Sequence, residues 1–198
     1  SVTVSSTFAA SGDITFTSDS IDLNGGADSV SSTGTITLEP GSAGSSIGIA
    51  GGVGTLQLTS AEIGALADGF SGIVIGRSDG SGAIVVNAVT FRDPVTIRSP
   101  QAGGTITVDG QITGSGDASV TLTAPGAGTT LNADIVTEGG GITITNGLVL
   151  GANVTLDSTN GGGVPTGGSI SIGGAVDADL ASNNRTLTLD AGTGGDIT

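Results

Sequence analysis

The chain of 198 residues contains no cysteine, methionine, tryptophan, tyrosine, histidine or lysine. The absence of cysteine excludes disulfides and thiolate metal sites. Without histidine and lysine, proton transfer in an enzyme would depend on the 18 acidic residues and the four arginines. Because methionine is absent, we expect a processed product or a segment of a longer protein.

The charge of the chain excludes further classes of protein. The net charge is −14, and four phenylalanines are the only aromatic residues. A nucleic-acid-binding surface needs basic patches and stacking rings, so we expect no nucleic-acid partner. No apolar run approaches the roughly 18 residues of a membrane helix, so we expect no membrane insertion.

Short aliphatic triplets recur along the chain, with apolar residues at alternate positions and a small residue between them. A period of two predicts β-strands that turn one face towards a core. Glycine, aspartate, asparagine and serine separate the triplets, as is typical of turns. Representative triplets are Ile36-Thr37-Leu38, Ile73-Val74-Ile75, Val95-Thr96-Ile97, Val120-Thr121-Leu122 and Ile142-Thr143-Ile144.

The low aromatic content, 2% of residues, favours stacked coils over a β-sandwich. A sandwich needs large side chains to fill the roughly 10 Å between its sheets. A parallel β-helix stacks small aliphatic side chains about 4.8 Å apart. We therefore predict an all-β fold, a parallel β-helix (β-solenoid), with residues 1–198 as one segment of a longer tandem or fibrous array. Coils of roughly 20 residues predict about 9–10 coils.

One segment, residues 60–68, departs from the strand pattern and predicts a short helix. Thr59 and Glu62 have the spacing of a capping box. Ile63 and Leu66 fall on one helical face and should pack against the coils. Gly69 is the expected C-terminal cap.

The chain resembles the filamentous-haemagglutinin-like repeats of giant bacterial surface and secreted proteins over about residues 55–198. The residues that carry the resemblance start at Leu58 with LTSAEIGALADGFSGIVIGRSDGSGAIVVNAVTFRDPVTIRSP and continue as GGTITVDGQITGSGDASVTLTAPG. Residues 1–54 share only the strand-and-glycine pattern. The resemblance implies a right-handed parallel β-helix, export to the cell surface, and a role in adhesion or extracellular assembly. It implies no catalytic residues.

The stretch Asp68–Arg98 holds three of the four arginines and two of the four phenylalanines. We interpret it as a structural anchor within the coils, in which the arginines pair with nearby acids and fix the register. The anchor residues are Phe70, Arg77, Phe91, Arg92 and Arg98.

Calcium is the one ion for which the sequence offers candidates, because acidic residues in turns can supply oxygen ligands. These candidates are Asp28, Asp79, Asp177 and Asp179. Solvated acids at corner turns explain the same residues more simply. We assign no catalytic and no cofactor-binding residue.

We expect a structural and adhesive extracellular module, one that builds a bacterial surface fibre, adhesin stalk or matrix filament by end-to-end stacking. Its partners would be neighbouring repeats or subunits, and surface glycans or host and abiotic surfaces. Two alternatives stay open. One is a carbohydrate-active enzyme on the same fold, similar to a polysaccharide lyase, since a β-helix alone does not decide function. The other is a calcium-binding β-sandwich of a surface layer or matrix.

Overall fold

The computed structural model describes all residues, 1–198, as 23 β-strands and one α-helix. Every one of the 18 strand pairings is parallel. Immunoglobulin-type β-sandwiches are built from antiparallel sheets, so the sandwich alternative is wrong.

The strands form three long parallel sheets and two short pairs. In spatial order, sheet 1 consists of β3 (Ile14–Thr17), β6 (Thr35–Glu39), β9 (Gly72–Ile75), β12 (Val95–Arg98), β15 (Val120–Thr123), β18 (Ile142–Ile144) and β21 (Ile170–Ile172). Sheet 2 consists of β8 (Leu56–Leu58), β7 (Ile47–Ile49), β10 (Ala83–Val86), β13 (Thr105–Val108), β16 (Thr129–Leu131), β19 (Leu148–Leu150) and β22 (Val176–Ala178). Sheet 3 consists of β11 (Val89–Phe91), β14 (Ile112–Gly114), β17 (Ile135–Thr137), β20 (Val154–Asp157) and β23 (Leu187–Asp190). The short pairs are β1 (Val2–Val4) with β4 (Ile21–Leu23), and β2 (Phe8–Ala9) with β5 (Val30–Ser31).

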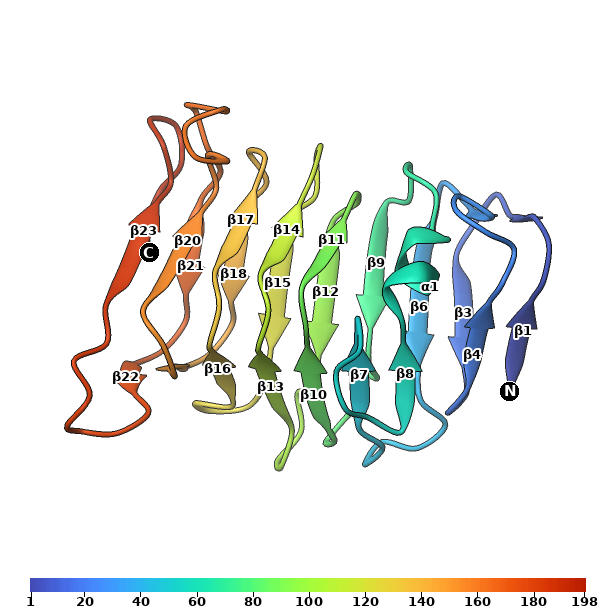
Figure 1. The fold of residues 1–198 in the computed structure, drawn as a ribbon, viewed down its shortest axis with the longest axis horizontal. Coiled ribbons are helices and arrows are strands. Elements are labelled where there is room, and N and C mark those ends of the chain that lie inside the picture. Colours follow the sequence, from blue (N-terminus) through green and yellow to red (C-terminus); the bar gives the residue numbers. More distant parts are fainter.

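From β10 onward the chain visits sheets 2, 3 and 1 in turn, and each strand pairs with the strand three places later. The strands stack along the long axis of the molecule, with the two termini towards opposite ends (Figure 1). This arrangement is compatible with the predicted parallel β-helix.

The chain makes eight circuits, which begin at β1, β4, β7, β10, β13, β16, β19 and β22. The prediction of 9–10 coils is therefore too high. Regular circuits are longer than 20 residues, since Ile14 pairs with Ile36, 22 residues later. An insertion lengthens another circuit further, because Ile36 pairs with Ile73, 37 residues later.

One continuous core of 38 buried residues runs through the stack. Its regularity comes from register, because an inward aliphatic residue pairs with an inward aliphatic residue of the next circuit. In sheet 1 this row is Ile36, Ile73, Val95, Val120, Ile142 and Ile170. Full burial of such a side chain contributes about 1.5–3 kcal/mol, and parallel pairing satisfies the backbone groups of the same residues.

The predicted helix is present but shorter, with α1 at Ser60–Gly64. Its capping box is confirmed: Glu62 N donates to Thr59 Oγ1 (3.2 Å) and Thr59 N donates to Glu62 Oε2 (2.7 Å). The helix ends at cap residue Ala65, and the prediction of Gly69 as the cap is wrong. Leu66 instead forms a parallel bridge with Val30, because Ala67 N donates to Val30 O (2.8 Å).

The helical segment interrupts sheet 3 between β5 and β11. Helix α1 contacts both β4 and β11, and the bridge at Leu66 continues from β5. Ile63, Leu66 and Phe70 are buried in the core, which confirms their predicted packing against the coils. The circuit that contains α1 is thus irregular outside and regular inside.

Replacing Phe91 by alanine tests the anchor's contribution to the core. Phe91 is 1% exposed and is among the largest fully buried side chains. We expect Phe91→Ala to lower the free energy of unfolding by about 3–5 kcal/mol, from lost burial and the cavity that remains. Urea unfolding followed by far-ultraviolet circular dichroism measures this, since the chain has no tryptophan or tyrosine. Val53→Ala, at a side chain that is 80% exposed, is the control, and equal midpoints for both variants would contradict the anchor role.

Candidate functional site

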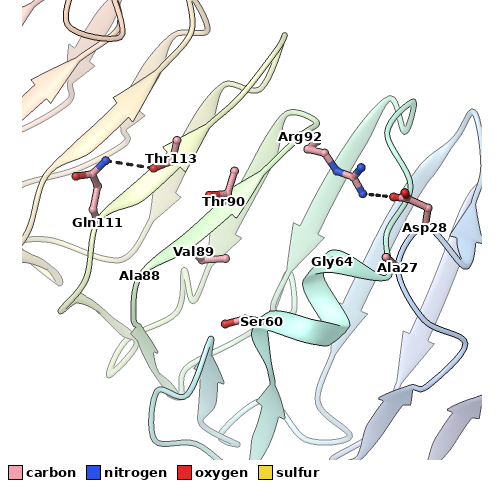
Figure 2. A pocket seen from close by; sticks show the side chains of 10 residues that line it. All are labelled: Ala27, Asp28, Ser60, Gly64, Ala88, Val89, Thr90, Arg92, Gln111 and Thr113. Carbon is pink, nitrogen blue, oxygen red and sulfur yellow. Dashed lines mark hydrogen bonds and ion pairs between the residues drawn. The ribbon is translucent and has the colours of Figure 1, made fainter.

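Arg92 connects three separate circuits at the end of β11. Its Nη2 donates to the Leu66 carbonyl oxygen (2.6 Å) and forms an ion pair with Asp28 Oδ1 (Figure 2). Asp28 precedes β5 and Leu66 follows α1. One planar guanidinium therefore ties the irregular circuit to both of its neighbours.

A groove of about 740 Å³ lies next to this contact. Helix α1 forms one wall, and β11 and β14 form the other (Figure 2). It exists because a helix stands where the neighbouring circuits have strands. Thr90, Gln111 and Thr113 present hydroxyl and amide groups to it. The groove therefore offers hydrogen bonds from a neutral surface, with Arg92 and Asp28 at its end.

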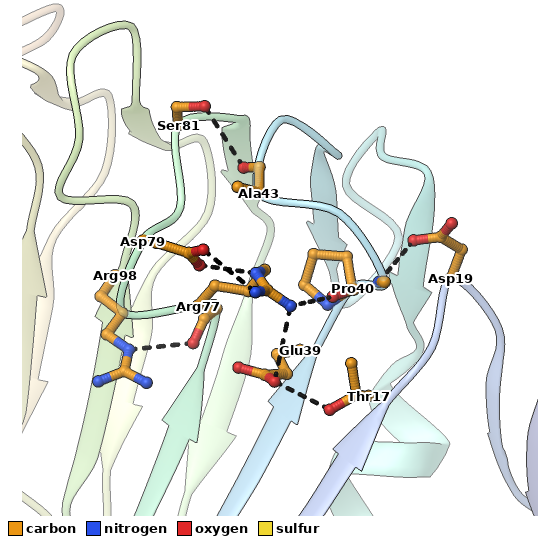
Figure 3. Close-up of polar contacts among 11 residues, drawn as sticks. Thr17, Asp19, Glu39, Pro40, Ala43, Arg77, Asp79, Ser81 and Arg98 are labelled. Carbon is orange, nitrogen blue, oxygen red and sulfur yellow. Dashed lines mark hydrogen bonds and ion pairs between the residues drawn. The ribbon is translucent and has the colours of Figure 1, made fainter.

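Arg77 forms a second network, across β3, β6 and β9 (Figure 3). Its Nε and Nη2 donate to the two carboxylate oxygens of Asp79 (2.7 and 3.2 Å). The hydrogen bonds from Arg77 hold the pKa of Asp79 below its ordinary value. Arg77 Nη1 also lies 3.8 Å from Glu39 Oε1, which accepts a hydrogen bond from Thr17 Oγ1 (2.9 Å).

Arg98 binds a backbone carbonyl instead of an acid. Its Nε donates to Gly76 O at 3.0 Å (Figure 3), and it takes part in none of the four ion pairs. The expected pairing with acids is thus confirmed for Arg77 and Arg92 and wrong for Arg98. Gly76 is required there, because its φ is 102° and a Cβ would lie 2.1 Å from the Arg98 carbonyl oxygen.

Three carboxylates meet at the corner between sheet 3 and sheet 1. Asp68 follows α1, Asp93 follows β11 and Asp117 follows β14. Their oxygens lie within 4.8 Å of one another, and the three side chains line one cavity of about 470 Å³. We call these three residues the corner cluster.

Asp93 is the buried member of the corner cluster, at 2% exposure. Its Oδ1 accepts a hydrogen bond from Gly69 N (2.8 Å), whereas its buried Oδ2 has no partner. Burial, and then the charges of Asp68 and Asp117, raise the pKa of Asp93 against the opposing effects of Gly69 and Arg92.

The four calcium candidates taken from the sequence lie elsewhere and apart. Asp28, Asp79 and Asp179 each pair with an arginine, which for Asp179 is Arg185 at 3.0 Å. Asp177 is exposed on β22. The corner cluster was not predicted, although its members are 25 and 24 residues apart, close to the length of one circuit. That periodicity is the signal by which it could have been found.

Asp157, the last residue of β20, organises a turn further along the same corner. Its Oδ1 accepts hydrogen bonds from Thr159 N and Thr159 Oγ1 (both 2.6 Å), and its Oδ2 accepts one from Gly161 N (2.7 Å). Burial acts to raise the pKa of Asp157, but these hydrogen bonds outweigh it and the pKa is lowered. Unlike Asp93, Asp157 has both oxygens occupied.

Comparisons with protein-family models, curated protein sequences and solved structures find no match to this chain. The resemblance to filamentous-haemagglutinin-like repeats therefore stays a prediction. No helix has the length and apolar character needed to cross a membrane.

Replacing Arg92 tests whether it fastens α1. We expect Arg92→Ala to lower the free energy of unfolding by about 1–3 kcal/mol, because the Leu66 carbonyl loses a charged donor. Amide hydrogen exchange should become faster at Ala65 and Ala67 in particular. Arg185→Ala is the matched control, since it removes an arginine–aspartate pair far from α1. Equal exchange at Ala67 in both variants would contradict the proposed role.

The stability contribution of Asp157 should depend on pH. Because its pKa is lower in the folded chain, its contribution is present above the ordinary carboxyl pKa of about 3.9 and is lost as pH falls through the lowered value. We expect Asp157→Asn to be less stable than the native chain at pH 6, by about 1–3 kcal/mol, with the difference shrinking towards pH 2. Urea midpoints at both pH values measure this. A difference that is the same at both would show that the carboxylate charge plays no part.

Proposed function

We propose that the chain is a right-handed parallel β-helix that serves as a structural and adhesive module of a bacterial extracellular fibre, adhesin stalk or matrix filament. The pairing of every third strand supports this winding, and parallel crossovers are right-handed in nearly all proteins. The proposed mechanism is continuous parallel pairing and aliphatic stacking, which would extend from one unit to the next.

The observation that carries this proposal is the open edge at each end of the stack (Figure 1). At one end, Val2 N donates to Ser20 O and Val4 O accepts from Asn24 N, so Val2 and Val4 face β4. The backbone groups of Thr3, between them, face away from β4. At the other end, β22 pairs only with β19, and its Val176 is 42% exposed. A further parallel strand, from a continuing chain or from another copy, fits either edge.

The outward surface suits broad contact with glycans or with host and abiotic surfaces. The outward row of sheet 1 contains Thr37, Thr96, Thr121 and Thr143. Their hydroxyl groups and the threonine and glutamine side chains of the groove can bond neutral sugars. The net charge of −14 favours a soluble, self-repelling surface away from nucleic acid.

The corner cluster is the observation that favours the alternative, a carbohydrate-active enzyme. A carboxyl with a raised pKa beside other carboxylates is a pattern of acid catalysis. A proton donor must, however, come within hydrogen-bond distance of the reacting oxygen. Asp93 is 2% exposed, so we favour the structural proposal.

Blocking one edge tests the proposed assembly. Thr3→Pro removes the outward N–H of β1, and an edge strand tolerates proline at such a position. We expect the native chain to associate with rising concentration in sedimentation velocity and to form filaments in electron microscopy, and Thr3→Pro to lose both properties.

Thr3→Ala, which keeps the N–H, is the control and should assemble as the native chain does. The unfolding midpoint of each variant verifies that the fold is retained. A native chain that stays monomeric at high concentration, or filaments unchanged by Thr3→Pro, would overturn end-to-end stacking through this edge.

A further inference from the structure

The corner cluster lies where the irregular circuit meets the regular ones. Asp68 belongs to the circuit with α1, and Asp93 and Asp117 belong to the next two. Residues that are distant in sequence thus bring three negative charges to one cavity. An arrangement of this kind is unfavourable unless something neutralises it.

No side chain of the protein supplies that neutralisation. None of the four ion pairs includes a member of the corner cluster. Arg92, the neighbour of Asp93 in sequence, directs its Nη2 to Leu66 O and Asp28. The chain has no histidine or lysine.

The unpartnered Oδ2 of Asp93 is an independent sign of a missing ligand. Buried polar atoms in proteins are almost always satisfied, and an exception calls for an unseen water or ion. Asp93 lines the same cavity as Asp68 and Asp117, and its other oxygen is already held by Gly69 N. The side chain is therefore fixed in place, with one ligand oxygen free.

We propose that Asp68, Asp93 and Asp117 bind a calcium ion that fastens the circuit of α1 to the two circuits after it. The three carboxylates would supply charged oxygen ligands, and the hydroxyl-bearing Thr33, Ser71 and Ser115 line the same cavity. Water completes the six to eight ligands that calcium takes.

The dimensions of the corner cluster suit calcium. Opposite ligands of an ion with bonds of about 2.3–2.6 Å are about 4.6–5.2 Å apart, and the cluster's oxygens lie within 4.8 Å of one another. Magnesium needs a near-ideal octahedron at about 2.0–2.1 Å and gives up its water reluctantly. Carboxylates from three separate circuits form an adaptable site, which calcium accepts more readily.

Calorimetric titration with calcium chloride at constant ionic strength tests the site directly. We expect saturable binding of one ion per chain and a melting temperature that rises with calcium concentration, as binding to the folded state alone requires. Magnesium chloride at the same concentrations should bind more weakly. An equal response to magnesium would overturn the assignment to calcium.

Asp93→Asn provides the decisive variant, with Asp177→Asn as its control. Both remove one negative charge, but Asp177 is exposed and remote from the corner cluster. We expect Asp93→Asn to lose calcium binding and the calcium-dependent melting shift, and Asp177→Asn to keep both. Without calcium, Asp93→Asn should melt no lower than the native chain, because the repulsion is relieved. Should it fail to fold, Asp117→Asn, at an exposed position, replaces it.

Two results would overturn the proposal. One is the absence of a saturable calcium isotherm for the native chain. The other is an equal calcium response in Asp93→Asn and Asp177→Asn, which would show general screening of an acidic surface. Neither result depends on whether the chain assembles end to end, so failure of this site and failure of the proposed fibre are distinguishable.

Discussion

The residue-by-residue stacking of parallel strands is the constraint on which the rest of the structure depends. Ile73 lies between Ile36 and Val95 in one row of sheet 1, so each inward side chain must fit the one before it and the one after it. Small aliphatic residues meet this condition with little adjustment, and rows of them give a continuous core. Large aromatic residues would force neighbouring circuits apart, which accounts for their scarcity.

Polar chemistry is consequently confined to the corners and to the one irregular circuit. An acid placed at a corner recurs near an acid of the next circuit, as in the corner cluster, and each charge must be neutralised or solvated. Arginines perform this role at Asp79 and Asp28. Hydrogen bonds from a turn perform it at Asp157. A bound cation would perform it at Asp93, and the same physical requirement thus has three different solutions along one stack.

The strand content and the capping of α1 could be predicted because both depend on neighbours in sequence. Alternation marks strands such as Val95–Arg98, and the side chains of Thr59 and Glu62 reach each other within one turn. The end of α1 could not be predicted. Leu66 leaves the helix because Val30, more than thirty residues earlier, offers it a parallel bridge, and local propensity contains no information about that partner.

The sequence alone determined that this chain forms short strands with one apolar face, that it carries a strong negative charge, and that one short helix interrupts the pattern. Only the tertiary structure decided which acids meet. Asp28 and Asp79 look like ligands in the sequence but lie against arginines, whereas the unremarked Asp68, Asp93 and Asp117 converge. The reason is register: alternation fixes the direction of a side chain within its strand, but the length of each circuit, including its insertions, fixes which corner residues become neighbours.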